Sequence, residues 1–175
     1  MLKKNILLTG PPRSGKSTLI EAVIGRIKEP VTGFFTREVR EGGERVGFSI
    51  NTVEGREGIL AHKSVRSRYR VGRYGVNLKD IEDIAVPAMI PSMHEEIVVI
   101  DEIGKMECFS RLFRETLSQV LDSSNRVLGS IALRGDAFIE AIKLREDVMV
   151  VEVTSQNRAI LVSQLLDTLK AFSIA

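Results

Sequence analysis

The sequence predicts an α/β protein in which helices cover both faces of a mostly parallel sheet. From residue 96 onward, strand-like apolar runs alternate with amphipathic segments, the order that forms right-handed βαβ units. A glycine-rich turn, Gly10 to Ser17, stands between an apolar run and a helical segment near the N-terminus. The run EIVVI, residues 96–100, is apolar up to Asp101, which is typical of a parallel strand buried on both faces.

The first third of the chain contains the turn and a β-hairpin. NILLT, residues 5–9, is a short apolar run that predicts a strand, and STLIEAVIGRIK, residues 17–28, has apolar residues at helical spacing. In GFFTREVREGGERVGFSINT, residues 33–52, two glycines separate two β-leaning runs, as a hairpin requires. These patterns predict a strand, a glycine loop, a helix and then a hairpin.

The middle of the chain is less regular. Residues 55–78 hold several glycines and a basic stretch with little periodicity, so we expect a loop-rich excursion. Residues 78–93 are helical in part, but Pro87 and Pro91 should break or kink the helix. Residues 31–78 thus form a β-hairpin/loop insertion, and such insertions commonly lie over the ligand end of the sheet.

The last third alternates regularly between helices and strands. We expect helices at 108–121, 136–143 and 157–172, with strands at 126–133 and 148–153. No internal repeat is visible. These units complete the predicted parallel sheet.

Length and composition favour one globular domain over residues 1–175. The 175 residues are 43% hydrophobic and 27% charged, enough for one sizeable core. The net charge of +2 requires neither a nucleic-acid nor a membrane partner, and no apolar run approaches membrane-spanning length. The one cysteine cannot form an internal disulfide, and no leader segment is visible, so a cytoplasmic protein is expected. The oligomeric state is open, and a monomer is our expectation.

The glycine-rich turn GPPRSGKS fits the Walker A pattern, in the strand–loop–helix context that the motif requires. Gly10 and Gly15 allow the loop amides to turn inward, where they and the helix N-terminus meet phosphate oxygens. Lys16 would reach the β- and γ-phosphates, and Ser17 would give its hydroxyl to Mg²⁺. An ordinary glycine-rich turn is the alternative.

The acids at the end of the apolar run are the second half of such a site. Asp101 is the Walker B candidate, a second metal ligand with Ser17. Glu102 is placed to orient and deprotonate a water in line with the γ-phosphate. Lys105 could neutralise charge on that phosphate, and Glu107 could support Lys105. A charge pair on a surface loop is an equally good interpretation of these two residues.

The remaining polar groups give weaker indications. The basic stretch Lys63, Arg66, Arg68, Arg70 and Arg73 resembles a nucleic-acid groove, but a solvated loop is commoner, and a lid over phosphates is a third choice. His62 and His94 are isolated, so no transition-metal site is assigned. Nucleic acid is therefore a possible partner but not the favoured one.

Together, GPPRSGKSTL, the hairpin, RVGRYGVNLKDIEDIAVPAM, VVIDEIGKMECFS and VTSQNR make the chain resemble the THEP-type, or cancer-related, nucleoside-triphosphatase family. The resemblance runs from residue 5 to about 170, and VIDEIGKME is its most specific piece. It implies a RecA-like P-loop NTPase domain that hydrolyses ATP, GTP and other NTPs to NDP and phosphate with Mg²⁺.

The resemblance also implies a set of site residues. Catalytic roles fall on Glu102, Lys16, Lys105 and Glu107, and the metal ligands are Ser17 and Asp101. Asn157 and Arg158, in the loop after the last strand, are candidates near the base. The nucleotide-binding residues are Gly10, Pro11, Pro12, Arg13, Ser14, Gly15, Lys16, Ser17, Thr18, Asp101, Glu102, Ile103, Gly104, Lys105, Met106, Glu107, Cys108, Asn157 and Arg158.

Three functions remain compatible with the residues. A hydrolase is favoured by Glu102 directly after Asp101. A kinase would transfer the γ-phosphoryl group to a nucleoside, nucleotide or RNA end, with arginines 66–73 as a lid. An NTP-dependent switch or binding module is the third, although no Asn-Lys-x-Asp motif for guanine is present. We expect the hydrolase, with broad base specificity.

Overall fold

The computed structural model describes residues 3–173, so the ends of the predicted domain, residues 1 and 175, lie outside the described residues. All strands of this part join one nine-stranded sheet, in the order β5-β6-β4-β3-β2-β7-β8-β1-β9. The strands are β1 (Asn5–Thr9), β2 (Val31–Glu41), β3 (Glu44–Thr52), β4 (Glu57–His62), β5 (Arg70–Val71), β6 (Tyr74–Val76), β7 (Ile97–Ile103), β8 (Arg126–Ile131) and β9 (Val148–Glu152).

The sheet has a parallel part and an antiparallel part. Strands β2, β7, β8, β1 and β9 pair in parallel, each with the next, whereas β3, β4, β6 and β5 continue the sheet from β2 as antiparallel neighbours. The predicted parallel sheet is therefore confirmed, and one strand, β8, separates β1 from β7.

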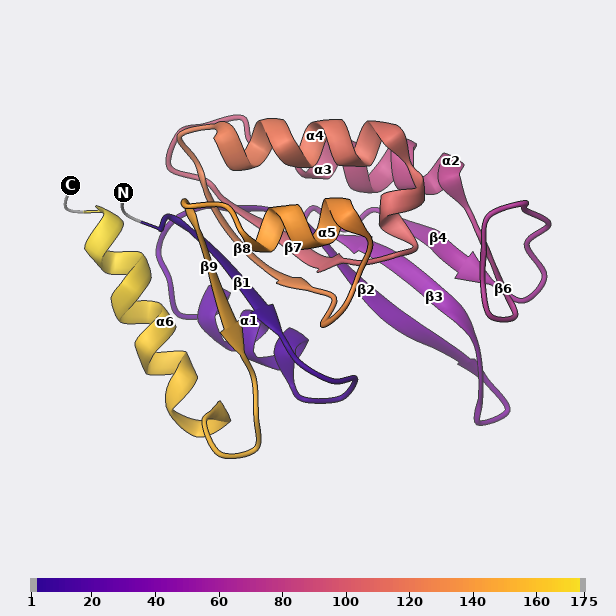
Figure 1. The fold of residues 1–175 in the computed structure, drawn as a ribbon, viewed down its shortest axis with the longest axis horizontal. Coiled ribbons are helices and arrows are strands. Elements are labelled where there is room, and N and C mark those ends of the chain that lie inside the picture. Colours follow the sequence, from indigo (N-terminus) through magenta and orange to yellow (C-terminus); the bar gives the residue numbers. More distant parts are fainter. Residues whose placement is uncertain (1–2, 174–175) are drawn as a thin grey trace.

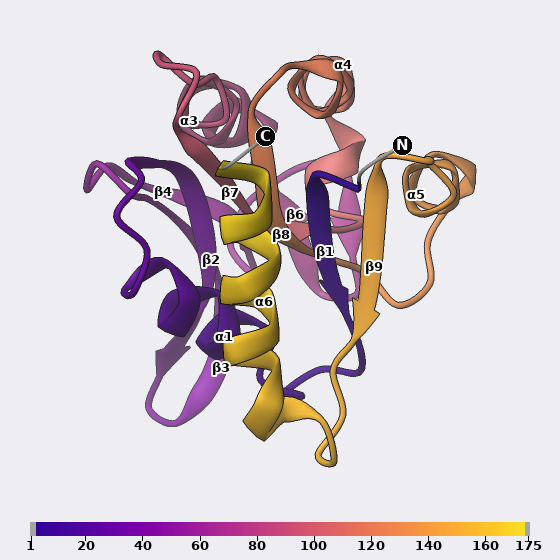
Figure 2. The ribbon, with the colours of Figure 1, turned by 90° about the vertical axis from the view of Figure 1, so that its left-hand side faces the viewer.

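Helices cover both faces of the sheet. In Figures 1 and 2, α3 and α4 lie on one side and α1 and α6 on the other. The helical segments are α1 (Lys16–Ile24), α2 (Leu78–Asp80), the π-helix η1 (Ile81–Ala85), α3 (Val86–Ala88), the 3-10 helix η2 (Glu107–Phe109), α4 (Arg111–Asp122), α5 (Ala137–Lys143) and α6 (Arg158–Ser173). None of them is long and apolar enough to span a membrane.

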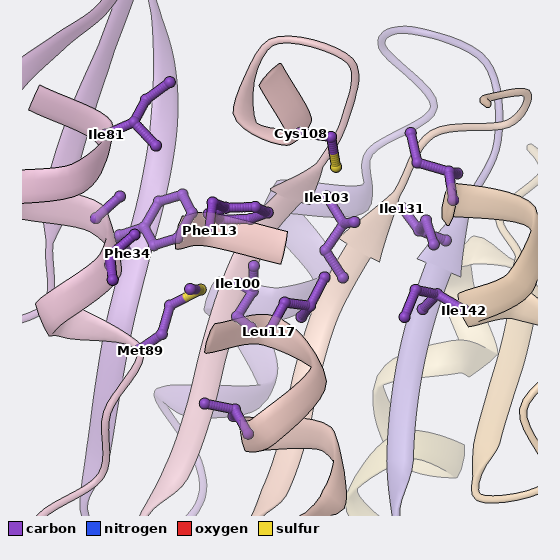
Figure 3. Close-up of a cluster of buried hydrophobic side chains, with 14 of the residues drawn as sticks. Phe34, Ile81, Met89, Ile100, Ile103, Cys108, Phe113, Leu117, Ile131 and Ile142 are labelled. Atoms are coloured by element: carbon purple, nitrogen blue, oxygen red, sulfur yellow. The ribbon is translucent and has the colours of Figure 1, made fainter. Parts of the chain in front are cut away.

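Successive residues of the central strands enter two separate cores. Val98 and Ile100 belong to the core beneath α4 and α5, which Figure 3 shows, while Ile97 and Val99 belong to the core beneath α1 and α6. Because side chains alternate along a strand, an apolar run with no polar position is what two covered faces require. The interpretation of residues 96–100 as a doubly buried strand is confirmed.

The hairpin is confirmed, but it does not simply lie over the sheet. Its first strand, β2, pairs in parallel with β7 through residues 31–35 and with β3 through residues 34–41, so it belongs to both parts of the sheet. Gly33 makes the first pairing possible, because a Cβ at this position would lie 1.9 Å from the Val99 carbonyl oxygen. The sequence pattern predicts residues 31–78 as an insertion into the alternation of strands and helices. It does so because β2 pairs with β7, which is far away in the sequence, and such a pairing leaves no local signal.

Two other differences have local causes. The expected loop at 55–78 instead contains three strands, β4, β5 and β6, which are too short to show a clear period in the sequence. The helix after β1 ends at Ile24 rather than continuing to residue 28, and Gly25, a poor helix former, occupies its C-cap position. The segment 78–88 remains helical through Pro87, which stands at the start of α3, directly after the π-helical turn.

Candidate active site

A cavity of about 580 Å³ lies at the carboxyl ends of β1 and β7. Residues after β1, at the end of β7 and at the start of α6 line one half of it. From the predicted nucleotide-binding set, the lining contains Pro12, Arg13, Gly15, Lys16, Ser17, Thr18, Asp101, Glu102, Lys105, Met106, Glu107 and Arg158. Residues from three separate segments of the chain therefore meet in one space.

The loop after β1 is held by its own backbone and by Lys16. Gly10, Arg13 and Gly15 all have positive φ, of 146°, 63° and 98°, and the two glycines adopt these values without the strain that a Cβ would bring. Lys16 Nζ donates to the carbonyl oxygens of Gly10 at 3.0 Å and Pro11 at 3.2 Å. The Lys16 ammonium group therefore lies across the loop opening, in a position to bind an anion.

Asp101 is joined to the loop and to the neighbouring strand. Ser17 Oγ donates to Asp101 Oδ2 at 2.5 Å, and Ser130 on β8 donates to Asp101 Oδ1. The Asp101 side chain is 3% exposed, and burial raises its pKa, while the hydrogen bonds from Ser130 and Ser17 oppose part of that rise. A carboxylate and a hydroxyl at this distance are oxygen donors of the kind that Mg²⁺ prefers.

Two further acids lie beside Asp101. Burial raises the pKa of Glu102, and the neighbouring Asp101 carboxylate raises it further, whereas Lys16 lowers it. Glu107 is only 3% exposed, and burial together with Glu102 raises its pKa well above the ordinary value. A methyl group on Gly104 would lie 2.9 Å from Glu102 Oε1 and 3.0 Å from Glu107 Oε2, so this glycine makes room for both acids.

Some predicted nucleotide contacts turn away from the cavity. Ile103 is fully buried in the core, and Cys108 is 3% exposed in the same core, where burial raises the pKa of its thiol to about 12. Asn157 accepts a hydrogen bond from the Thr154 amide and donates to the Glu152 carbonyl, so its side chain closes the loop before α6. These three side chains do not line the cavity, and their contacts with a nucleotide stay a prediction.

Other predicted positions act through the backbone. Gly10, Pro11, Ser14 and Gly104 do not line the cavity, but the first two supply the carbonyls that hold Lys16. Arg158 packs over the loop, since a Cβ on Gly15 would lie 2.9 Å from Arg158 Cδ. Arg158 also lines the cavity that contains the β7 acids.

The structure adds residues that the sequence analysis missed. Ser130 belongs to the strand RVLGSI and is completely buried. A single polar residue within an apolar strand is the sequence signal that could have identified it. The second half of the cavity comes from the antiparallel part of the sheet, for which no motif gave a signal. Its lining residues are Thr36, Arg37, Glu38, Phe48, Leu60 and Val71.

The basic stretch lies beside this second half. Arg68 donates to the Tyr69 hydroxyl at 2.8 Å, and Arg70 donates to the Arg73 carbonyl at 2.7 Å. Arg73 pairs with Glu44 at 2.6 Å. Arg68 and Arg70 therefore hold their own segment together, Arg73 joins it to β3, and the segment places Val71 in the cavity.

Comparisons with known proteins agree with this architecture. The family model described as NTPase matches residues 5–166. The nucleoside-triphosphatase THEP1 of Thermotoga sp. (strain RQ2) is 46% identical, with 94% of this chain and 95% of that protein covered. The human cancer-related nucleoside-triphosphatase is 38% identical, with 90% and 92% covered.

Two solved structures share the fold. The crystal structure of THEP1 from the hyperthermophile Aquifex aeolicus gives a TM-score of 0.86 at 34% identity, covering 95% of this chain and 99% of that one. The solution structure of the human cancer-related nucleoside triphosphatase gives 0.81 at 37% identity, covering 96% and 98%. With its Walker-type loop, its strand-end acids and these relatives, the chain belongs to the NTPase family of THEP-type nucleoside-triphosphatases and has their P-loop fold.

Proposed function

We propose that this protein is a Mg²⁺-dependent nucleoside-triphosphatase that converts ATP, GTP and other NTPs to NDP and phosphate. The observation that carries the proposal is the meeting of Lys16, Ser17, Asp101 and Glu102 in one cavity. Membership of the family supports hydrolysis in general, and the donor set at Ser17 and Asp101 supports the metal.

The triphosphate would lie along the loop after β1. Lys16 would exchange its two carbonyl contacts for the β- and γ-phosphates, while loop amides bind the phosphate oxygens. Ser17 and Asp101 would hold Mg²⁺, which offsets the charge of the β- and γ-phosphates when bound. Ser130 keeps the Asp101 carboxylate turned toward Ser17.

Glu102 would accept the proton of the attacking water. A general base works best when its pKa is close to the working pH, and burial moves Glu102 in that direction. Glu107, on the other side of Gly104, is the second acid within reach and would support the orientation of that water.

Broad base specificity follows from the groups at the opposite end of the site. Arg158 can stack its guanidinium plane on any base, and such contacts tolerate different bases. Asn157 is held by the loop backbone, so it is not free to select one base edge.

The decisive experiment replaces the proposed base and its competitor by isosteric amides. Glu102→Gln should lower turnover by about 10²- to 10⁴-fold with ATP affinity nearly unchanged, because only the proton-accepting charge is lost. Phosphate release and calorimetric ATP affinity should be measured for Glu102→Gln and Glu107→Gln at equal Mg²⁺. Retention of more than a tenth of the turnover by Glu102→Gln, with Glu107→Gln inactive, would move the base to Glu107.

A further inference from the structure

The half of the cavity that the proposed hydrolysis does not use differs from the other half in the kind of side chains that line it. We call it the hairpin half and define it by Thr36, Arg37, Glu38, Phe48, Leu60 and Val71. Three of these six side chains are apolar, and one of the three is aromatic. A pocket for a small molecule commonly combines such apolar walls with a few polar groups.

The order of the strands fixes where the hairpin half lies relative to the nucleotide. Along the carboxyl edge, β9 leads to Arg158, β1 leads to the phosphate loop, and β7 carries the acids. Beyond β7 come β2, β3, β4, β6 and β5, and all of these except β6 supply the hairpin half. A triphosphate with its base toward Arg158 therefore directs its γ-phosphate toward the acids, and the hairpin half begins on their other side.

The wall of the hairpin half is fixed before any ligand arrives. The Phe48 ring has the Arg45 guanidinium 5.2 Å from its centroid and meets Tyr74 edge-on, with the ring centroids 5.4 Å apart. Arg45 donates in turn to the Tyr74 hydroxyl at 3.1 Å. An aromatic ring held in this way can bind another ring without losing much conformational freedom.

The charged side chains of this wall already form ion pairs with other residues of the protein. Glu38 accepts hydrogen bonds from Arg40 at 2.9 Å and from Arg45 at 3.0 Å, and Arg37 is paired with Glu21. A charged ligand would have to compete with these pairs. An aromatic, apolar surface whose charges are already paired instead fits a flat, uncharged molecule.

We propose that the hairpin half binds a nucleoside and presents one of its hydroxyl groups to the γ-phosphate in place of water. The inference rests on the proposed placement of the triphosphate. The hydroxyl oxygen would form a bond to the γ-phosphorus while the bond to the β–γ bridging oxygen breaks, and the NDP leaves with that electron pair. Glu102 would take the hydroxyl proton, so the products are NDP and a nucleoside monophosphate.

The test measures how the γ-phosphoryl group divides between water and nucleoside. The protein is incubated with Mg²⁺ and γ-labelled ATP, alone, with adenosine, guanosine, cytidine, uridine or thymidine, and with a 5′-hydroxyl RNA oligonucleotide at two salt concentrations. Labelled nucleoside monophosphate and labelled inorganic phosphate are quantified together. Phe48→Ala and Phe48→Leu should lower the ratio of the first to the second by about tenfold to hundredfold, the usual effect of losing a stacked base.

A matched control comes from the neighbouring strand. Ile59 on β4 is 43% exposed and does not line the cavity, so Ile59→Ala should keep the parental ratio. Val71→Glu tests the wall without removing a large side chain, and it should lower the ratio because it adds a charge. Thermal melting of each variant shows whether it is folded.

The outcomes separate this inference from the proposed function. If the parent releases phosphate from ATP but labels none of the five nucleosides, the acceptor subsite is wrong and the hydrolase stands. If the parent releases no phosphate and labels nothing, the proposed function fails as well. Labelling of an RNA 5′ end alone, weakening steeply with salt, would overturn the inference in favour of a polynucleotide acceptor.

Discussion

Glu107 is a carboxyl group that is almost completely buried beside a second carboxyl group, Glu102. Both circumstances favour its neutral form, which is why its pKa is raised well above the ordinary value of 4.5. The unfolded chain would ionise Glu107 near that ordinary value, whereas the folded protein keeps the proton to a higher pH. The contribution of Glu107 to folding stability is therefore present below about pH 4.5 and is lost as pH rises through the raised pKa.

The direction of this change in stability with pH gives a prediction for the nucleotide-free protein. Glu107→Gln removes the ionisation, so its melting temperature relative to the parent should be higher at about pH 8 than at about pH 5, since the parent alone loses stability as its Glu107 ionises. Melting curves in EDTA, at matched ionic strength, measure the difference. A difference that stays constant across this range would show that Glu107 does not titrate between the folded and unfolded states as described.

At the scale of the elements, the contact between β7 and β8 controls the position of Asp101. Gly129 on β8 is followed by Ser130, which holds Asp101, and Ile100 on β7 is followed by Asp101 itself. A Cβ on Gly129 would lie 2.3 Å from the Ile100 carbonyl oxygen, closer than atoms can approach. The two strands can pack as they do only with glycine at this position.

Gly129→Ala should therefore destabilise the protein by about 1–3 kcal/mol, the usual cost of forcing atoms into a packed core. It should also lower turnover, because separating the strands displaces the Ser130–Asp101 pair. Gly42→Ala in the hairpin turn is the control, since no atom lies within 4 Å of its Cβ position and its φ of 56° alone costs about 1–2 kcal/mol. Urea denaturation and phosphate release compare the two, and equal losses of turnover would contradict the role of this contact.

The short hairpin of β5 and β6 gives a second prediction at this scale. Arg68 and Arg70 bind partners within their own segment, and that segment places Val71 in the cavity. Arg68→Ala combined with Arg70→Ala should change NTP turnover far more than affinity for single-stranded RNA. Turnover and RNA binding should be measured at two salt concentrations, because a true groove binds RNA with a steep salt dependence. Salt-sensitive RNA binding that the double variant loses would favour a nucleic-acid function.

At the scale of the whole molecule, the phosphate loop connects the two cores. The loop joins β1, whose residues enter both cores, to α1, which packs with α6 on one face of the sheet. A ligand bound to this loop should therefore stabilise the cooperative unit and not the loop alone. Any ligand that binds only the folded state has this effect.

With Mg²⁺ and a non-hydrolysable ATP analogue at 100 times its dissociation constant, the gain should be about 2.7 kcal/mol. For a domain of this size that corresponds to a rise of about 5–10 °C in melting temperature. Lys16→Ala should lose most of the rise at the same concentration, because the ammonium group reaches the β- and γ-phosphates. Differential scanning calorimetry measures both proteins, and an equal rise in the variant would remove Lys16 from the phosphate site.

The features that the sequence predicted are those whose residues are consecutive. The phosphate loop lies between β1 and α1 because the glycines, the lysine and the serine are adjacent, and local backbone geometry alone brings them together. The strand that carries Asp101 was predictable for the same reason, since seven consecutive residues contain both the apolar run and the acids. Periodicity within single segments was equally sufficient for α4, α5, α6, β8 and β9.

Only the tertiary structure decided which distant segments share the cavity. Phe48, Leu60 and Val71 come from three strands of the antiparallel part, and each reaches the site because β2 pairs with both β3 and β7. That pairing depends on a register between residues more than 60 positions apart, for example Phe34 and Ile100. Local propensity contains no information about such a register, because many alternative pairings satisfy the same alternation of side chains. The sequence by itself therefore determined the phosphate loop and its acids, and the packing of the sheet decided what lies across from them.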